Sequence, residues 1–156
     1  MRPVFLLLAL AACEDPEPGI EVGTGEREFE PLEDGDDILI IQGPQGGFHV
    51  LGSFLVTGVE AGDTDNLFDP DNPTMHFTVR EEGDRVDVSN PFIQGLDDGP
   101  GRGEHQVTGR FVFLDIEADD ELVGSTLVLS IDLEDVNGVV LHDEVTLNGV
   151  ASPFNE

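Results

Sequence analysis

The sequence has no lysine, no tryptophan and no tyrosine, and it has a single cysteine among its 156 residues. One cysteine cannot form an intramolecular disulfide, so a hydrophobic core must stabilise the fold alone. Only six arginines oppose 34 aspartates and glutamates, which gives a formal net charge of −28 at pH 7. A surface of that sign disfavours nucleic acids and anionic lipid headgroups as partners. Carboxylates spread along the whole chain are typical of proteins that stay soluble in a salty setting.

The sequence also lacks an apolar run long enough to cross a bilayer. Residues 4–10 are apolar, far fewer than the roughly 20 that a membrane-spanning helix needs. The run follows Arg2 and ends in Leu10-Ala11-Ala12-Cys13. A positive residue, a short apolar stretch and a small-residue cleavage site are typical of a secretory signal. Because cysteine comes directly after that site, the motif resembles the lipobox of bacterial signal-peptidase-II substrates.

This resemblance implies that residues 1–12 are the signal peptide and that the sulfur of Cys13 carries a diacylglycerol. Each buried acyl methylene contributes about 0.8 kcal/mol, so the lipid bilayer would hold the protein through Cys13. Residues 13–19 are acidic and contain two prolines, which predicts an extended tether. We therefore expect a bacterial cell-envelope protein, lipid-anchored to the outer membrane and facing either the periplasm or the cell surface.

Helix signals are nearly absent, because no ten-residue stretch carries an apolar stripe at helical spacing. From Ile20 onward, short runs rich in β-branched and apolar residues alternate with Gly, Asp, Asn and Pro, which is the pattern of an all-β domain. The clearest strand covers residues 127–134, where alternation predicts one buried face. Asn137-Gly138 then supplies the positive φ angles of a tight hairpin, so residues 139–147 should return antiparallel.

Turn residues divide the rest of the domain into further strands. Glu82-Gly83-Asp84 predicts a second hairpin. Two long loops, 60–74 and 90–104, are expected to lie at one end of the domain and to carry any binding surface. The domain, residues 20–156, is therefore expected to be a single immunoglobulin-like or fibronectin-III-like antiparallel β-sandwich of seven to nine strands. The other predicted strands are 37–42, 48–59, 75–81, 85–89 and 105–117, with weaker edge strands at 20–23 and 27–29 and one helical turn within 115–122.

Aspartates are concentrated in the first of these loops. Asp63, Asp65, Asp69 and Asp71 alternate there with other residues, so that side chains could wrap one ion. Ca²⁺ takes six to eight oxygen ligands, and the segment resembles the aspartate-rich calcium loops of extracellular proteins in composition. It departs from the EF-hand pattern in lacking that loop's glycine and its closing glutamate. Ca²⁺ is therefore an alternative to a solvated turn, and apart from it no cofactor is expected.

Other chemistry is weakly represented. His49, His76, His105 and His142 are potential ligands of a transition metal, but no two share a metal-site spacing, and alternation predicts that His76 and His142 are exposed. No serine lies in a Gly-x-Ser-x-Gly motif, and no free thiol remains once Cys13 is acylated. The acids are too numerous for one catalytic pair to stand out. We expect no catalytic residues and no enzyme activity.

The most distinctive local sequence is Gly43-Pro44-Gln45-Gly46-Gly47-Phe48-His49-Val50. Pro44 fixes φ and the glycine pair allows conformations closed to other residues, which predicts a turn between two strands. No lysine follows, so the turn is not a phosphate loop. With the lipobox and the strand pattern, it resembles a family of uncharacterised bacterial lipoproteins with a Gly-Pro-Gln-Gly-Gly-aromatic-His-Val turn before a long strand. The resemblance covers residues 23–58 and implies an immunoglobulin-like sandwich, and this chain has Leu51 where those proteins often have an aromatic residue.

These features predict a lipid-anchored cell-envelope protein that displays an acidic β-sandwich as a non-catalytic structural or ligand-binding module. Its expected partner beyond the bilayer is a protein or glycan of the envelope, and not nucleic acid. The alternative is a calcium-dependent adhesion or binding module that uses the loop from Asp63 to Asp71. A periplasmic metal carrier or a degenerate hydrolase is a weaker hypothesis.

Overall fold

The computed structural model describes residues 16–155, and within that range the chain is all-β. The signal and Cys13 lie outside the described residues. None of the described residues forms a helix with the length and apolarity that a membrane crossing needs. The elements are β1 (Gly19–Thr24), β2 (Glu30–Pro31), β3 (Asp37–Gln42), β4 (Phe48–Thr57), β5 (Thr74–Glu81), β6 (Asp84–Arg85), β7 (Phe92–Ile93), β8 (Asp97–Asp98), β9 (Glu104–Leu114), the 3₁₀ turn η1 (Asp119–Glu121), β10 (Thr126–Glu134) and β11 (Val140–Ala151).

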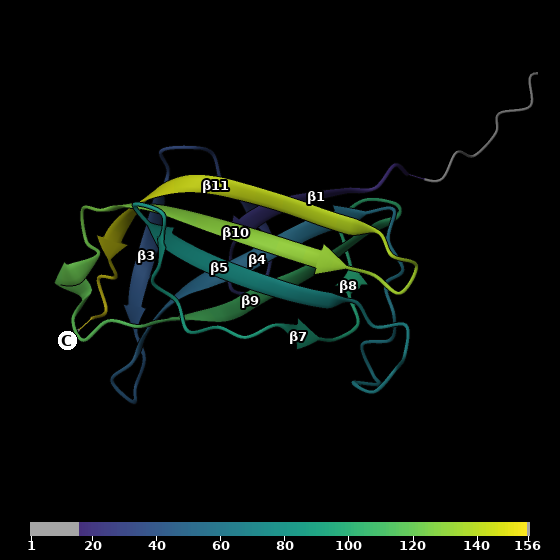
Figure 1. Ribbon diagram of the computed structural model, residues 1–156, viewed down its shortest axis with the longest axis horizontal. Coiled ribbons are helices and arrows are strands. Elements are labelled where there is room, and N and C mark those ends of the chain that lie inside the picture. The colour runs from purple at the N-terminus through teal and green to yellow at the C-terminus, as the bar shows by residue number, and fades with distance from the viewer. Residues whose placement is uncertain (1–15, 156) are drawn as a thin grey trace, which may run out of the picture.

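The eleven strands of the described chain belong to one open hydrogen-bonded sheet. Its path runs β2-β1-β4-β3-β11-β10-β5-β6, with β9 paired to β4 and β8, and β7 paired to β5. All pairs are antiparallel except β3 with β11. Strand β3 links two parts of the sheet, because residues 37–40 pair with β11 whereas Ile41 and Gln42 pair with β4. In Figure 1, β5, β10 and β11 form the layer nearer the viewer, and β4 and β9 lie behind them.

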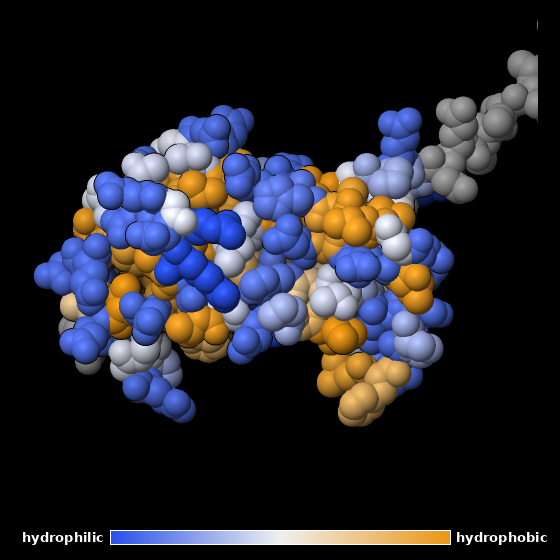
Figure 2. Space-filling view, viewed as in Figure 1, coloured by the Kyte–Doolittle hydropathy of each residue, from blue (hydrophilic) through white to orange (hydrophobic). Residues whose placement is uncertain are grey.

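The core lies between these two layers. The predicted alternation in β10 is confirmed, since Leu127, Leu129, Ile131 and Leu133 are at most 1% exposed. Phe54 of β4 and Phe77 of β5 meet from opposite layers with ring centroids 6.0 Å apart. Polar side chains cover much of the outer surface, as the charge requires (Figure 2).

Glycine is required where β4 passes the Phe77 ring. A Cβ atom at Gly52 would lie 2.9 Å from one ring carbon, closer than such atoms pack. We therefore expect Gly52→Ala to lower the free energy of unfolding by about 1 to 3 kcal/mol through overpacking. Gly47→Ala is the control, because a Cβ there meets no atom within 4 Å. Urea denaturation of both variants measures the difference, and equal stabilities would show that the layers are not in contact at Gly52.

Both predicted hairpins are present, but the turn between β10 and β11 differs from the prediction. Only Gly138 has positive φ there, 80°, and the Asp135 N–H donates to the carbonyl of Val139 at 3.0 Å. The Asp135 carboxylate accepts the N–H groups of Asn137, Val139 and Glu60. Burial alone would raise the pKa of Asp135, but these donors outweigh it and hold the pKa below its ordinary value. The turn is thus organised around a buried carboxylate.

Several sequence predictions are corrected. The strand count of seven to nine is wrong, because the described chain has eleven strands, several of them only two residues long. The edge strand expected at 27–29 is wrong, since β2 is Glu30–Pro31. The helical turn expected within 115–122 is present as the 3₁₀ turn Asp119–Glu121.

The strand expected at 85–89 pairs with β5 only as far as Val86, whose N–H donates to the carbonyl of Val79, and from Asp87 onward it pairs with β9 instead. The loop 90–104 contains the short strands β7 and β8. It lies beside loop 60–74 as predicted, because the Leu96 N–H donates to the carbonyl of Ala61 at 2.8 Å.

Candidate ligand-binding groove

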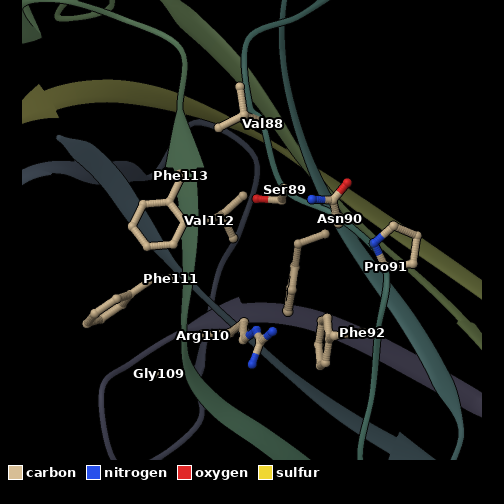
Figure 3. A pocket seen from close by; sticks show the side chains of 11 residues that line it. Val88, Ser89, Asn90, Pro91, Phe92, Gly109, Arg110, Phe111, Val112 and Phe113 are labelled. Carbon is tan, nitrogen blue, oxygen red and sulfur yellow. The ribbon is translucent and has the colours of Figure 1, made fainter.

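A groove of about 530 Å³ lies between β9 and the connection from β6 to β7 (Figure 3). Residues 88–92 form one wall and residues 109–113 form the other, and Phe77 of β5, whose ring stacks on that of Phe92, also lines the groove. None of these eleven lining residues is acidic, although acids make up 34 of the 156 residues of the chain. The groove is therefore chemically unlike the rest of the surface.

The groove opens because the chain after β6 changes partners. The Val88 N–H donates to the carbonyl of Phe113 at 2.9 Å, and the Asp115 N–H donates to that of Val86 at 2.8 Å. The chain then leaves β9 for β5, where Phe92 pairs with Met75. At the other end of the groove, β9 pairs with β8. Between these two contacts the edge of β9 faces the groove.

Phe111 has an unpaired backbone in this interval. Successive residues of a strand direct their N–H and C=O groups to opposite sides. The carbonyl of Phe113 faces Val88, so the groups of Val112, opposite Val50, face β4. Phe111 therefore directs its N–H and C=O away from β4, and no residue within 16–155 pairs with either. Such groups at a sheet edge are a template for another strand.

Asp87 holds the wall opposite β9. Its side chain is 0% exposed, and its carboxylate accepts the N–H groups of Val79 and Ser89, both at 2.9 Å. The Arg85 guanidinium donates to both of its oxygens and also to the carbonyl of Ser89. Burial alone would raise the pKa of Asp87, but these donors outweigh it and lower the pKa below its ordinary value. One ionised carboxylate thus fixes where Ser89 enters the groove.

Arg110 of β9 reaches into the groove. Its guanidinium carbon lies 3.9 Å from the centroid of the Phe92 ring, and the two side chains face each other in Figure 3. Arg110 is half-buried, and the ion pairs of the described residues involve only Arg85 and His142 as cations. Although the chain has a net charge of −28, this guanidinium forms no ion pair with a carboxylate of residues 16–155. Its free N–H donors match the geometry of a carboxylate or phosphate.

Ser89 adds a second unsatisfied group to the groove. Its backbone N–H and carbonyl are both bonded, but its buried Oγ has no hydrogen-bond partner within the described chain. The side chain points toward β9 in Figure 3. A buried hydroxyl without a partner costs free energy unless a ligand or solvent satisfies it. Arg110 and Ser89 thus supply two free polar groups on opposite walls.

The outer face of β9 carries an aromatic cluster beside the Gly43–Gly47 turn, which lies between β3 and β4 as predicted. The His49 ring lies 4.4 Å from that of Phe111 and 6.1 Å from that of Phe113, centroid to centroid. Burial lowers the pKa of His49, so this imidazole is neutral near pH 7. Phe111 stands opposite Leu51 and supplies an aromatic ring on this face.

The aspartates predicted to bind calcium lie in the loop between β4 and β5. Asp63 and Asp69 each accept, at 2.9 Å, the N–H group two residues further along the chain. Within residues 16–155, no three Asp, Glu, His or Cys side chains form a group that could hold a metal ion. The tip of the loop, at the lower right of Figure 2, exposes Leu67 and Phe68. Calcium binding by Asp63, Asp65, Asp69 and Asp71 stays a prediction.

Asn72 organises this loop. Its Oδ1 accepts the N–H of Asp63 at 2.8 Å, and its Nδ2 donates to the carbonyl of Asn66 at 2.9 Å. Asn72→Ala leaves both groups unpaired, so we expect the free energy of unfolding to fall by about 1 to 3 kcal/mol and proteolysis of the loop to accelerate. Asp65→Ala is the control, because no described donor bonds to its exposed carboxylate. Equal effects of the two substitutions would contradict this role of Asn72.

The four histidines lie on four different strands, β4, β5, β9 and β11. His142 is exposed as predicted, and its Nδ1 lies 2.8 Å from a carboxylate oxygen of Asp132. The expected exposure of His76 is wrong. It is half-buried because the segment that leaves β6 passes over it, and its Nε2 lies 3.2 Å from the carbonyl oxygen of Ser89.

Comparison with known proteins assigns no relative, since no protein-family model, no curated protein and no solved structure matches the chain. The groove residues Arg110, Ser89 and Phe92 were not singled out from the sequence. The one available signal was Arg110 itself, one of only six cations, placed beside an apolar stretch of a predicted strand. The position of Arg110 in the sequence does not reveal which segment of the chain packs opposite it across the groove.

Proposed function

We propose that the protein is a lipid-anchored, non-catalytic binding module of the cell envelope and that its ligand occupies the groove beside β9. The observation that carries the proposal is Arg110, a half-buried guanidinium without a carboxylate partner among residues 16–155, in a groove without acidic lining. Acidic residues are abundant in this chain, whose net charge is −28, so a neighbouring carboxylate could easily have formed an ion pair with Arg110. A cation kept unpaired in such a chain is suited to an external anion.

The pairing order supports an immunoglobulin-like sandwich. Strands β8-β9-β4-β3 and β11-β10-β5-β6 follow one another by hydrogen bonding. These orders match D-E-B-A and G-F-C-C′ of that sandwich, with β1 and β2 as additions. Such domains carry ligand sites on edges and loops while the core stays constant, which is consistent with a binding role.

The lipobox at Leu10–Cys13 supports the proposed anchor. The packed domain begins close behind it, because the Thr57 hydroxyl donates to the carbonyl of Glu17 at 2.8 Å and β1 starts at Gly19. The domain would therefore follow the anchor after only a few residues. Intact-mass analysis of protein from the native host tests the anchor: the expected product starts at Cys13 and carries acyl chains, and an unmodified thiol would refute it.

Site-specific crosslinking in the native host tests the groove. A photoreactive benzoyl-phenylalanine is placed at Asn90, on the exposed rim of the groove, or at Val140, an exposed position of β11 away from the groove. We expect an adduct from position 90 only, and we expect Arg110→Gln to abolish it. Equal adducts from both positions, or an adduct unaffected by Arg110→Gln, would refute the proposed site.

The calcium-dependent module is the second candidate. The tip of the loop from Asp63 to Asp71 favours contact with a partner, because the apolar side chains of Leu67 and Phe68 are 64% and 94% exposed there. Calorimetric titration with Ca²⁺ tests it. Tight uptake that is lost in Asp65→Ala and Asp69→Ala would support this candidate, and absence of heat would eliminate it.

A further inference from the structure

We infer that the ligand of the groove is an extended peptide segment that pairs with the open edge of β9 and places a carboxylate against Arg110. This inference rests on the proposed function, because it names the ligand of the same groove.

The backbone of β9 argues for a peptide. The interval between its contacts with β8 and with Val88 contains a β-bulge at Gly109, whose φ is 65°, so the regular strand that is open to pairing is residues 110–112, about 10 Å long. Phe111 presents both an N–H and a C=O toward the groove. An extended segment of three or four residues would satisfy both groups in the way that strand addition does elsewhere. Most small ligands do not carry a hydrogen-bond acceptor and a donor at the spacing needed to pair with the N–H and C=O of one strand residue.

The two free polar groups argue for a carboxylate on that segment. The Phe92 ring supports one face of the Arg110 guanidinium, which leaves its edge free for two parallel hydrogen bonds to a carboxylate. The unpartnered Ser89 hydroxyl on the opposite wall can donate a third. A phosphate would also fit the guanidinium edge, but its second negative charge would be repelled more strongly by a chain of net charge −28.

The negative electrostatic field of the chain also restricts which residues can flank the carboxylate in the peptide. A segment with several acids, or a second copy of this chain, would be repelled at long range. The partner segment is therefore expected to carry one carboxylate between neutral or basic residues, which the surrounding surface attracts. Added salt should weaken its binding.

Titration of the full mature chain with a defined peptide tests the inference. The probe is the peptide Lys-Thr-Val-Glu-Val-Thr-Lys with both termini blocked, and its affinity is measured by isothermal titration calorimetry. We expect binding that falls at least about tenfold in Arg110→Gln, and equally when the peptide glutamate is replaced by glutamine. The two losses should not add, because they remove the same contact. Arg80→Gln, which removes a half-buried arginine of β5 outside the groove lining, should leave the affinity unchanged.

Backbone methylation separates strand pairing from side-chain contact. Two further peptides carry N-methyl groups on alternate amides, one along each edge of the extended peptide. We expect one of them to lose binding and the other to retain it, because only one edge faces β9. A probe that lacks glutamate and ends in a free carboxylate distinguishes a side-chain source of that group from a chain terminus.

The outcomes separate the inference from the function on which it rests. Peptides that do not bind, bind independently of Arg110, or bind equally with either edge methylated would overturn the inference. If crosslinking at Asn90 nevertheless depends on Arg110, the groove is a binding site for another class of ligand. If the peptides bind but no crosslink forms in the host, the inference about groove chemistry stands and the proposed function fails.

Discussion

Replacement of Asp87 by alanine is expected to lower the free energy of unfolding by about 3 to 5 kcal/mol, the usual cost of removing one partner of a buried charged network. The carboxylate is 0% exposed and accepts the N–H groups of Val79 and Ser89 as well as the Arg85 guanidinium. Alanine leaves the backbone N–H groups of Val79 and Ser89 without this acceptor, whereas the Arg85 side chain, which is 43% exposed, can still be solvated. Urea denaturation, with the midpoint and the slope both fitted, measures the loss.

Asp84→Ala is the matched control for this experiment, because it removes an exposed acid from the same hairpin. It is expected to change stability by no more than about 0.5 kcal/mol. A small effect of Asp87→Ala, similar to that of Asp84→Ala, would mean that the wall opposite β9 is not held by this carboxylate.

The same network has a pH signature. The pKa of Asp87 is lower in the folded state than its ordinary value, so its contribution is present above about pH 4, the unfolded value, and is lost as pH falls through the folded pKa. Asp135 acts in the same direction. Stability should therefore fall on acidification below pH 4 in the native chain, and this slope should be shallower in Asp87→Asn.

Phe54→Ala is expected to cost about 3 to 5 kcal/mol, because it leaves a cavity where the two layers meet. Phe54 is 0% exposed and contacts the Phe77 ring across the core. Phe68→Ala removes the same side chain from the loop tip, where it is exposed, and should change stability little. Thermal or urea unfolding compares the two, and similar midpoints would contradict the packing of the layers through Phe54.

Local patterns in the sequence predict most strands correctly. Alternation places Leu129 and Ile131 in the core, and Glu82-Gly83 and Gly138 mark hairpin turns, because each signal involves residues close together in the chain. The pairing of the segment after Val86 could not be predicted. The apolar residues of this segment suit pairing with β5 or with β9, and the choice depends on a hydrogen bond between Val88 and Phe113, which lie far apart in sequence.

The candidate site was hidden for a related reason. Arg110 comes from β9, whereas Ser89 and Phe92 come from a connection that precedes it by about twenty residues. The sequence drew attention instead to the aspartates of loop 60–74, because composition makes them conspicuous. In the structure, Asp63 and Asp69 accept hydrogen bonds from their own loop, a use that composition does not distinguish from metal binding.

The central claim is that β9 offers an unpaired edge beside Arg110, and amide hydrogen exchange at Phe111 tests it most directly. In the free full chain, the N–H of Phe111 is expected to exchange at least about 100-fold faster than that of Val112, which is paired toward Val50. Addition of the blocked peptide should slow exchange at Phe111 and leave Val112 unchanged. Equal protection of both amides in the free chain would contradict the account, because it would mean that the edge is already covered.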